Sequence, residues 1–176
     1  MVLDRFSCLI EERAVTCVMG PSGRGKTTLL RIMMGLEQPD SGQVNGMAKL
    51  RKSAVFQENR LCENLSAASN IRLVCREPVA LRDIIDSMSA IGLNPDCAKQ
   101  PVRIMSGGQR RRIAILRALM AEYDVLFLDE PFKGLDAETK ERTMKYARER
   151  NLDKTVVLVT HDESECEAMG GRIIYV

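Results

Sequence analysis

The sequence predicts an α/β protein with a mostly parallel sheet built around a phosphate-binding loop. Three observations lead to this prediction: a glycine-rich loop lies between a strand-like and a helix-like segment, and two runs of apolar residues, 125–128 and 155–159, each lead into polar residues. Continuous apolar runs of this length are typical of parallel strands that are covered on both faces. Because ligands bind beyond the carboxyl ends of such strands, the residues after each strand are the first candidates for a functional site.

The glycine-rich loop matches the pattern G-x-x-x-x-G-K-[ST] at every fixed position. Residues 14–19 before it predict a short buried strand, and residues 27–34 after it predict a helix closed by Gly35. Glycines let successive N–H groups point at phosphates, and the helix N-terminus adds partial positive charge. We expect Lys26 to neutralise the β- and γ-phosphates and the Thr27 hydroxyl to ligate Mg²⁺. A plain turn between strand and helix would not need both residues in register. The predicted nucleotide-binding residues are Gly20, Pro21, Ser22, Gly23, Arg24, Gly25, Lys26, Thr27 and Thr28.

The apolar run 125–128 ends in two adjacent carboxylates, Asp129 and Glu130. At the carboxyl end of a parallel strand, Asp129 is placed to bind Mg²⁺ directly or through water. Glu130 is the candidate general base for an attacking water. The alternative is that both residues cap the next turn, which accounts for one carboxylate more readily than for two.

Composition indicates a single domain without a polyanionic partner. The chain has 176 residues and a net charge of +2, so we expect one domain over 1–176 and no nucleic-acid binding. No stretch approaches the ~18 apolar residues of a membrane span, and acidic and basic residues occur too early for a signal peptide. The six cysteines show no metal-binding spacing and read as reduced thiols. Three consecutive arginines, residues 110–112, are interpreted as a basic exposed face.

The motifs together resemble the nucleotide-binding subunit of an ATP-binding-cassette (ABC) transporter. Residues 20–27 are similar to the family's Walker A motif, residues 105–109 to its signature motif, and residues 126–130 to its Walker B motif. A signature motif that precedes Walker B is nearly diagnostic of this family. The resemblance implies an ATPase with Mg²⁺ as cofactor, in which Glu130 is the catalytic base and Asp129 a metal ligand beside Thr27.

Three single residues extend the resemblance. Gln57 follows a strand-like segment and resembles the Q-loop glutamine, which implies contact with the γ-phosphate and Mg²⁺. Asp136 resembles the aspartate of the D-loop. His161, the only histidine, resembles the switch histidine that contacts the γ-phosphate. Without the family, a lone histidine at a strand end would be read as structural and a glutamine after a strand as solvated.

The signature also has a physical interpretation. Ser106 can cap a helix that starts near Gly107, and small residues at that helix start leave N–H groups open to an anion. In the family the anion is the γ-phosphate held by a second subunit. The resemblance therefore implies a head-to-tail dimer with two-fold symmetry, in which Ser106, Gly107, Gly108 and Gln109 contact the partner's ATP.

The resemblance also implies an architecture. We expect a P-loop NTPase core over about 1–57 and 106–176, a small N-terminal β-subdomain, and an inserted helical subdomain over about 58–105. Family members carry an aromatic residue upstream of Walker A that stacks on adenine. Phe6 is the only aromatic residue before Gly20 and aligns better with a strand, so that segment is expected to be missing.

The leading functional hypothesis is a cytoplasmic transport ATPase that lies on the inner face of the membrane and docks on a separate transmembrane permease. In the family a groove after the Q-loop receives the permease, and Leu61, Leu65 and Ile71 would either line it or belong to the core. The alternative is a soluble ABC ATPase in a non-transport role. A non-hydrolysing binding module is disfavoured by the intact Lys26 and Glu130.

Overall fold

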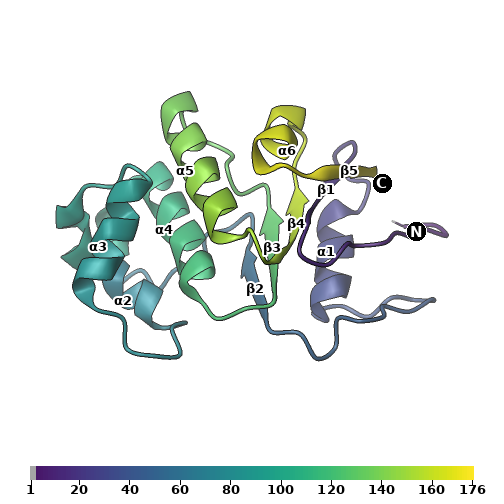
Figure 1. Ribbon diagram of the computed structural model, residues 1–176, viewed down its shortest axis with the longest axis horizontal. Coiled ribbons are helices and arrows are strands. Elements are labelled where there is room, and N and C mark those ends of the chain that lie inside the picture. The colour runs from purple at the N-terminus through teal and green to yellow at the C-terminus, as the bar shows by residue number, and fades with distance from the viewer. Residues whose placement is uncertain (1–2) are drawn as a thin grey trace. The chain divides into compact units, whose positions relative to one another are not determined.

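The computed structural model describes residues 3–176 (Figure 1). The contacts divide the chain into two compact units. The first contains the residues up to Ala54 together with Tyr123–Glu130 and Asn151–Val176, and the second contains Val55–Glu122 and Pro131–Arg150. The first unit is centred on a sheet, and the second is helical.

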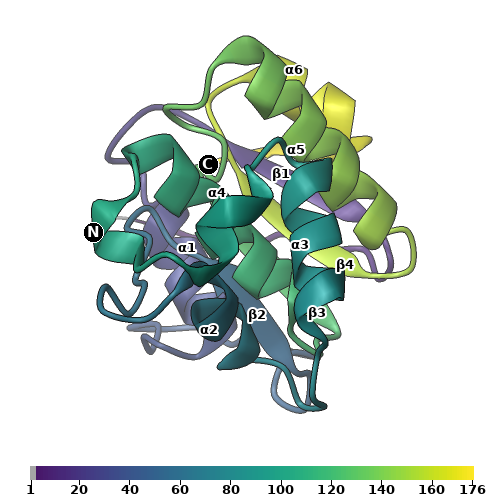
Figure 2. The same ribbon diagram turned by 90° about the vertical axis from the view of Figure 1, so that its left-hand side faces the viewer.

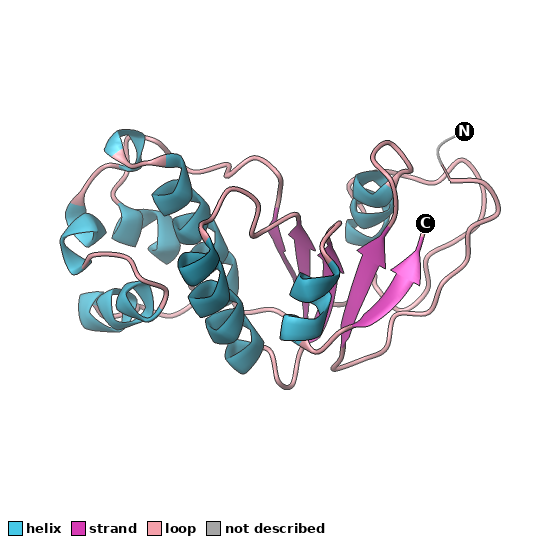
Figure 3. Ribbon diagram, turned by 90° about the horizontal axis from the view of Figure 1, so that it is seen from above, coloured by secondary structure: helices cyan, strands magenta, loops and turns pink. Residues whose placement is uncertain are grey.

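A five-stranded sheet organises the first unit (Figure 3). Its strand order is β2-β3-β4-β1-β5. Its strands are β1 (Val15–Met19), β2 (Lys52–Val55), β3 (Val125–Asp129), β4 (Thr155–Val159) and β5 (Arg172–Tyr175). β4 pairs in parallel with both β3 and β1, and β1 pairs in parallel with β5. Every residue of β3 and β4 is buried, as expected for parallel strands covered on both faces. The parallel register brings the carboxyl ends of β1, β3 and β4 to one edge.

Two helices cover opposite faces of this sheet. Successive strand residues point to opposite faces: Val18 packs in a core with Leu30 of α1 (Lys26–Met34), whereas the Cys17 side chain hydrogen-bonds with that of Cys166 on α6 (Glu163–Met169). Burial, followed by this neighbour, raises the pKa of the Cys17 thiol. The six cysteines are free, as the sequence predicts.

The second unit has its own core among four α-helices (Figure 2). They are α2 (Ala67–Arg72), α3 (Leu81–Ala90), α4 (Gly107–Met120) and α5 (Ala137–Arg150), with short 3₁₀ turns at Pro95–Lys99 and Val102–Ile104. α4 packs against α2 and α3, and α5 packs against both α3 and α4. The helices are held by fully buried apolar side chains, which include Ile71, Ile84, Met88, Val102, Ile113 and Leu116.

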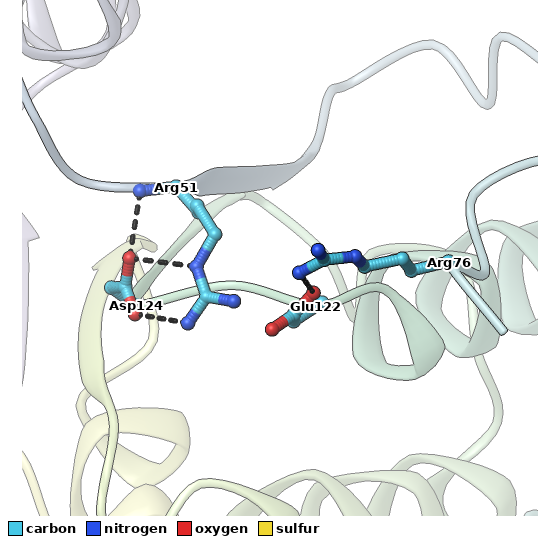
Figure 4. Close-up of polar contacts among 4 residues, drawn as sticks. All are labelled: Arg51, Arg76, Glu122 and Asp124. Atoms are coloured by element: carbon cyan, nitrogen blue, oxygen red, sulfur yellow. Dashed lines mark hydrogen bonds and ion pairs between the residues drawn. The ribbon is translucent and has the colours of Figure 1, made fainter.

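Each unit also has an ion pair near the connection between α4 and β3 (Figure 4). In the first unit, the Arg51 side chain and its backbone N–H donate to both carboxylate oxygens of Asp124 at 2.7 to 3.0 Å. This contact ties the residue before β2 to the residue before β3. In the second unit, Arg76 meets Glu122 through a single contact of 3.1 Å.

Two features differ from the expected architecture. No strand forms in residues 3–14 or 35–51, where a small β-subdomain was expected. Gly42 and Gly46 have φ values of 87° and 82° in that stretch, a backbone that interrupts an extended strand. The second unit is also wider than the expected 58–105 insertion, because α4 and α5 pack with its helices.

Candidate functional site

The glycine-rich loop joins β1 to α1, the context that its pattern requires. Gly23 and Gly25 have φ values of 81° and 92°, a left-handed backbone that favours glycine, and Gly25 precedes the first helical residue. At Gly20, a Cβ atom would lie only 2.5 Å from the carbonyl oxygen of Val176. The loop therefore needs its glycines both to turn and to pass close to the neighbouring backbone.

Lys26 lies at the first position of α1, with only 8 % of its surface exposed. Its ammonium donates to the carbonyl oxygens of Gly20 at 2.7 Å and Pro21 at 2.9 Å. The charge is thus held over the loop, at the positive end of the helix dipole. An anion at this helix N-terminus would meet both the ammonium and free backbone N–H groups.

Thr27 and Asp129 meet across the site. The Thr27 hydroxyl donates to Oδ2 of Asp129 at 3.0 Å, and Asp129 is 2 % exposed at the carboxyl end of β3. A hydroxyl oxygen and a carboxylate oxygen at this separation form a hard oxygen donor set, which suits Mg²⁺ completed by water and phosphate oxygens. The residues present therefore fit the expected cation.

Glu130 has a strained backbone at the end of β3. Its φ is 46°, a left-handed conformation that costs a non-glycine residue about 1–3 kcal/mol. Its N–H donates to the carbonyl of Val159 at 2.9 Å, which fixes the strained residue to the end of β4. One carboxylate oxygen lies 3.7 Å from Nδ1 of His161. The arrangement directs a largely buried carboxylate toward an exposed imidazole.

A buried carboxylate that the sequence did not predict stabilises the turn at His161. The Thr160 hydroxyl donates to Oε2 of Glu165 at 2.6 Å and accepts from the N–H of Asp162 at 3.1 Å. Thr160 and Glu165 are 1 % and 5 % exposed. The two residues that flank His161 are therefore fixed by one buried hydroxyl. The signal in the sequence was a threonine and an acid five positions apart on either side of a helix start.

The signature segment caps α4 as predicted. The Ser106 hydroxyl accepts from the N–H of Gln109 at 3.2 Å, and the Gln109 side chain accepts from the N–H of Ser106 at 2.8 Å. These two bonds form a capping box. Gly107 has no atom within 4 Å of where a Cβ would lie, so the helix start is open.

Gln57 and Asp136 lie in the second unit with the signature segment. Gln57 is exposed, and its carbonyl accepts from Arg111. The Asp136 carboxylate accepts from the N–H of Thr139 at 3.0 Å at the start of α5, and the hydrogen bonds from Thr139 lower its pKa. The first unit thus gathers residues 20–28 with Asp129, Glu130 and His161.

The arginine run at 110–112 is not the exposed basic face that we expected. Arg111 is buried, with 6 % exposed, and donates to backbone carbonyls of its own unit. Arg112 is half-buried and donates to the carbonyls of Ile91 and Gly92 after α3. The expectation was wrong because backbone carbonyls that no helix or strand satisfies lie close to α4.

Phe6, the aromatic residue before the glycine-rich loop, is part of the apolar packing of the first unit. It is partly buried and packs against the core that contains Val18 and Leu30.

Comparison with known proteins gives a consistent result. The family model described as ABC transporter matches residues 3–133. The thiamine import ATP-binding protein ThiQ of Chelativorans sp. is 33 % identical over 98 % of this chain and 76 % of its own length. The spermidine/putrescine import ATP-binding protein PotA of Treponema pallidum is 36 % identical over 98 % of this chain, which spans 50 % of that relative.

Solved structures of the bacterial ABC transporter cassette MJ0796 have the same fold. Its dimeric structure superimposes on this chain with a TM-score of 0.86 at 29 % sequence identity. The match covers 99 % of this chain and 86 % of the MJ0796 chain. A dimeric post-hydrolysis state of the same cassette, bound to ADP and Pi, gives a TM-score of 0.85 at the same identity and coverage.

Proposed function

Because this chain belongs to the ABC transporter family, we propose that it is the subunit that hydrolyses ATP to drive a membrane transporter. The observation that supports this most strongly is the contact between Thr27 and Asp129 beside Lys26, because it combines a phosphate site with a cation site. Within residues 3–176, no helix is both long and apolar enough to span a membrane. The membrane path would therefore belong to a separate permease.

The proposed chemistry is the attack of water on the γ-phosphorus of ATP. Lys26 binds the β- and γ-phosphates, and the loop N–H groups of residues 22–28 orient the chain of phosphates. Thr27 and Asp129 would hold Mg²⁺, which would neutralise charge on the phosphate oxygens. A further contact from Gln57 to the metal remains a prediction from the family resemblance. Glu130 accepts the proton of the attacking water, and His161 beside it contacts the γ-phosphate. The products are ADP and phosphate.

The active site is proposed to be shared between two copies of the chain. The open helix start at Gly107 offers N–H groups to an anion, as a γ-phosphate held by the other copy would be. The structures of the similar cassette MJ0796 are dimeric, which supports this assembly. In a head-to-tail pair each ATP would lie between Lys26 of one copy and Ser106 of the other, with Asp136 of the D-loop also near the interface.

Several relatives are named as import proteins, so we propose import across the cell membrane, with this chain on its cytoplasmic face. Their printed cargoes differ, among them thiamine, sulfate and spermidine, so the cargo is left open. For the permease groove, Ile71 is fully buried in the core of the second unit, whereas Leu65 is 38 % exposed. Leu65 is therefore the better groove candidate.

Phosphate release from Mg-ATP by the purified chain tests the proposed function, with Lys26→Ala as the matched inactive variant. We expect turnover in the wild type only. Co-purification with a polytopic membrane protein then separates a transport role from a soluble ABC ATPase. A wild type that binds ATP without turnover, alone and with its co-purified partners, would leave a binding module instead.

A further inference from the structure

The buried guanidinium of Arg111 has no role in the chemistry described so far. Arg111 lies on α4, two positions after the signature glutamine, and is 6 % exposed. A charged side chain is rarely buried to this extent unless it binds specific partners. Its partners therefore indicate what it does.

Arg111 donates to two segments that are far apart in the chain. Its Nε donates to the carbonyl of Pro131 at 2.7 Å. One terminal nitrogen donates to the carbonyls of Phe56 and Gln57, the latter at 3.2 Å, and to Oδ1 of Asn59 at 3.3 Å. All of these residues lie in the second unit.

Two of these acceptors are linked to the proposed chemistry by the sequence. Gln57 is itself a predicted metal and γ-phosphate contact, and Pro131 directly follows Glu130 in the chain. A guanidinium is a rigid planar fork, so one side chain fixes the directions of both segments at once. A lysine ammonium has the charge but not this geometry.

Arg117 provides an internal comparison, because it also lies on α4 and also donates to the segment that follows β2. Its two terminal nitrogens donate to the carbonyls of Arg60 at 2.8 Å and Asn59 at 3.2 Å. It therefore ties residues 59–60 to α4 without bonding to Gln57 or Pro131. The two arginines share a structural task, but only Arg111 contacts the functional segments.

We propose that Arg111 is a positioning residue for ATP hydrolysis, which fixes the backbone of Gln57 and of Pro131 to the signature helix. One guanidinium then holds the Q-loop and the residue after the catalytic base to the signature helix. This inference rests on the proposed function, and it assigns that site a further residue, one that acts through the backbone of Gln57 and Pro131.

Three variants test it: Arg111→Met, which removes the donors at similar length, Arg111→Lys, and the matched control Arg117→Met. For Arg111→Met we expect kcat to fall about tenfold to a hundredfold, with KM for ATP within about threefold of wild type, because the phosphate-binding residues are unchanged. Arg111→Lys should recover part of the loss. Arg117→Met should lower the melting temperature comparably but leave kcat within about twofold of wild type.

A purely structural role predicts a different result. If Arg111→Met and Arg117→Met lower kcat equally, or if folded Arg111→Met keeps the wild-type kcat, the proposal is overturned. Should Arg111→Met fail to fold, a folded Arg111→Gln variant with wild-type kcat overturns the proposal in the same way. A wild type without turnover overturns both this inference and the proposed function. Wild-type turnover with an unaffected variant overturns this inference alone.

Discussion

The two units of this protein position their functional groups in different ways. In the first unit the backbone does so: β1 leads into the glycine loop, β3 ends in Asp129 followed by Glu130, and β4 is followed by the turn of His161. In the second unit the segment around Gln57 belongs to no helix or strand, and side chains hold it instead.

The difference shows which parts of a site are fixed by topology and which by single side chains. A strand end in a parallel sheet stays where it is as long as the sheet forms, because every residue of β3 and β4 is buried. A loop held by hydrogen bonds to its carbonyls depends on each donor. Substitutions at the functional strand ends of the first unit should therefore affect chemistry, and substitutions of loop donors in the second unit should affect geometry.

The largest expected effect is on the chemistry of the first unit. Glu130→Gln removes the proposed base with little change in shape, so turnover should fall by about 10²- to 10⁴-fold while ATP binding remains. Phosphate release and a nucleotide titration measure the two quantities. Glu163→Gln, on the first turn of α6, serves as the control and should retain activity. A Glu130→Gln variant within threefold of the wild-type rate would remove Glu130 from this role.

A smaller effect, on stability, is expected from a side chain of the second unit that donates hydrogen bonds to the preceding loop. Asn70 is fully buried, and its amide donates to the carbonyls of Cys62, Leu65 and Ser66 while its oxygen accepts from the N–H of Cys62. Asn70→Ala leaves the Cys62 N–H without its amide acceptor and removes one bond from each of the three carbonyls, so the free energy of unfolding should fall by about 1–3 kcal/mol. Urea denaturation measures it, with the exposed Asn45→Ala as control. Equal stability of the two variants would show that the loop does not depend on this amide.

The smallest expected effect is on how the stability of the first unit depends on pH. Hydrogen bonds from the Arg51 side chain and N–H hold the pKa of Asp124 well below its ordinary value. A lowered folded-state pKa contributes stability above the unfolded value of about 3.9, and this contribution is lost as the pH falls further. The gap in urea midpoint between wild type and Asp124→Asn should therefore shrink below about pH 4. Glu122→Gln, which breaks a pair with a single contact, is the control. A gap that stays constant down to pH 2.5 would contradict the assigned cause.

The sequence was sufficient to predict most of the first unit. The buried strands, the glycine loop and the residues at strand ends follow from local pattern, and the structure forms β1, β3 and β4 within one residue of their predicted bounds. The cap of Ser106 on α4 was also readable, because capping is local.

What could not be predicted depends on contacts distant in sequence. The burial of Arg111 needs carbonyls 52 to 55 positions before it and 20 after it, and an arginine run alone reads as an exposed face. The hydrogen bond between Thr160 and Glu165 depends on the turn between β4 and α6, whose conformation the sequence pattern does not specify. The extent of the second unit likewise depends on how α4 and α5 pack against its other helices, and no sequence motif specifies this packing.

A mixing experiment tests the shared site most directly. Lys26→Ala and Ser106→Arg should each be inactive alone, because each breaks both sites of a symmetric dimer. In a mixed dimer, the Lys26 of one copy would meet the Ser106 of the other, and one site would be intact. An equimolar mixture, in which half the dimers are mixed, should therefore recover about a quarter of the wild-type turnover. A mixture no more active than the mean of its two components would contradict a site built from two copies.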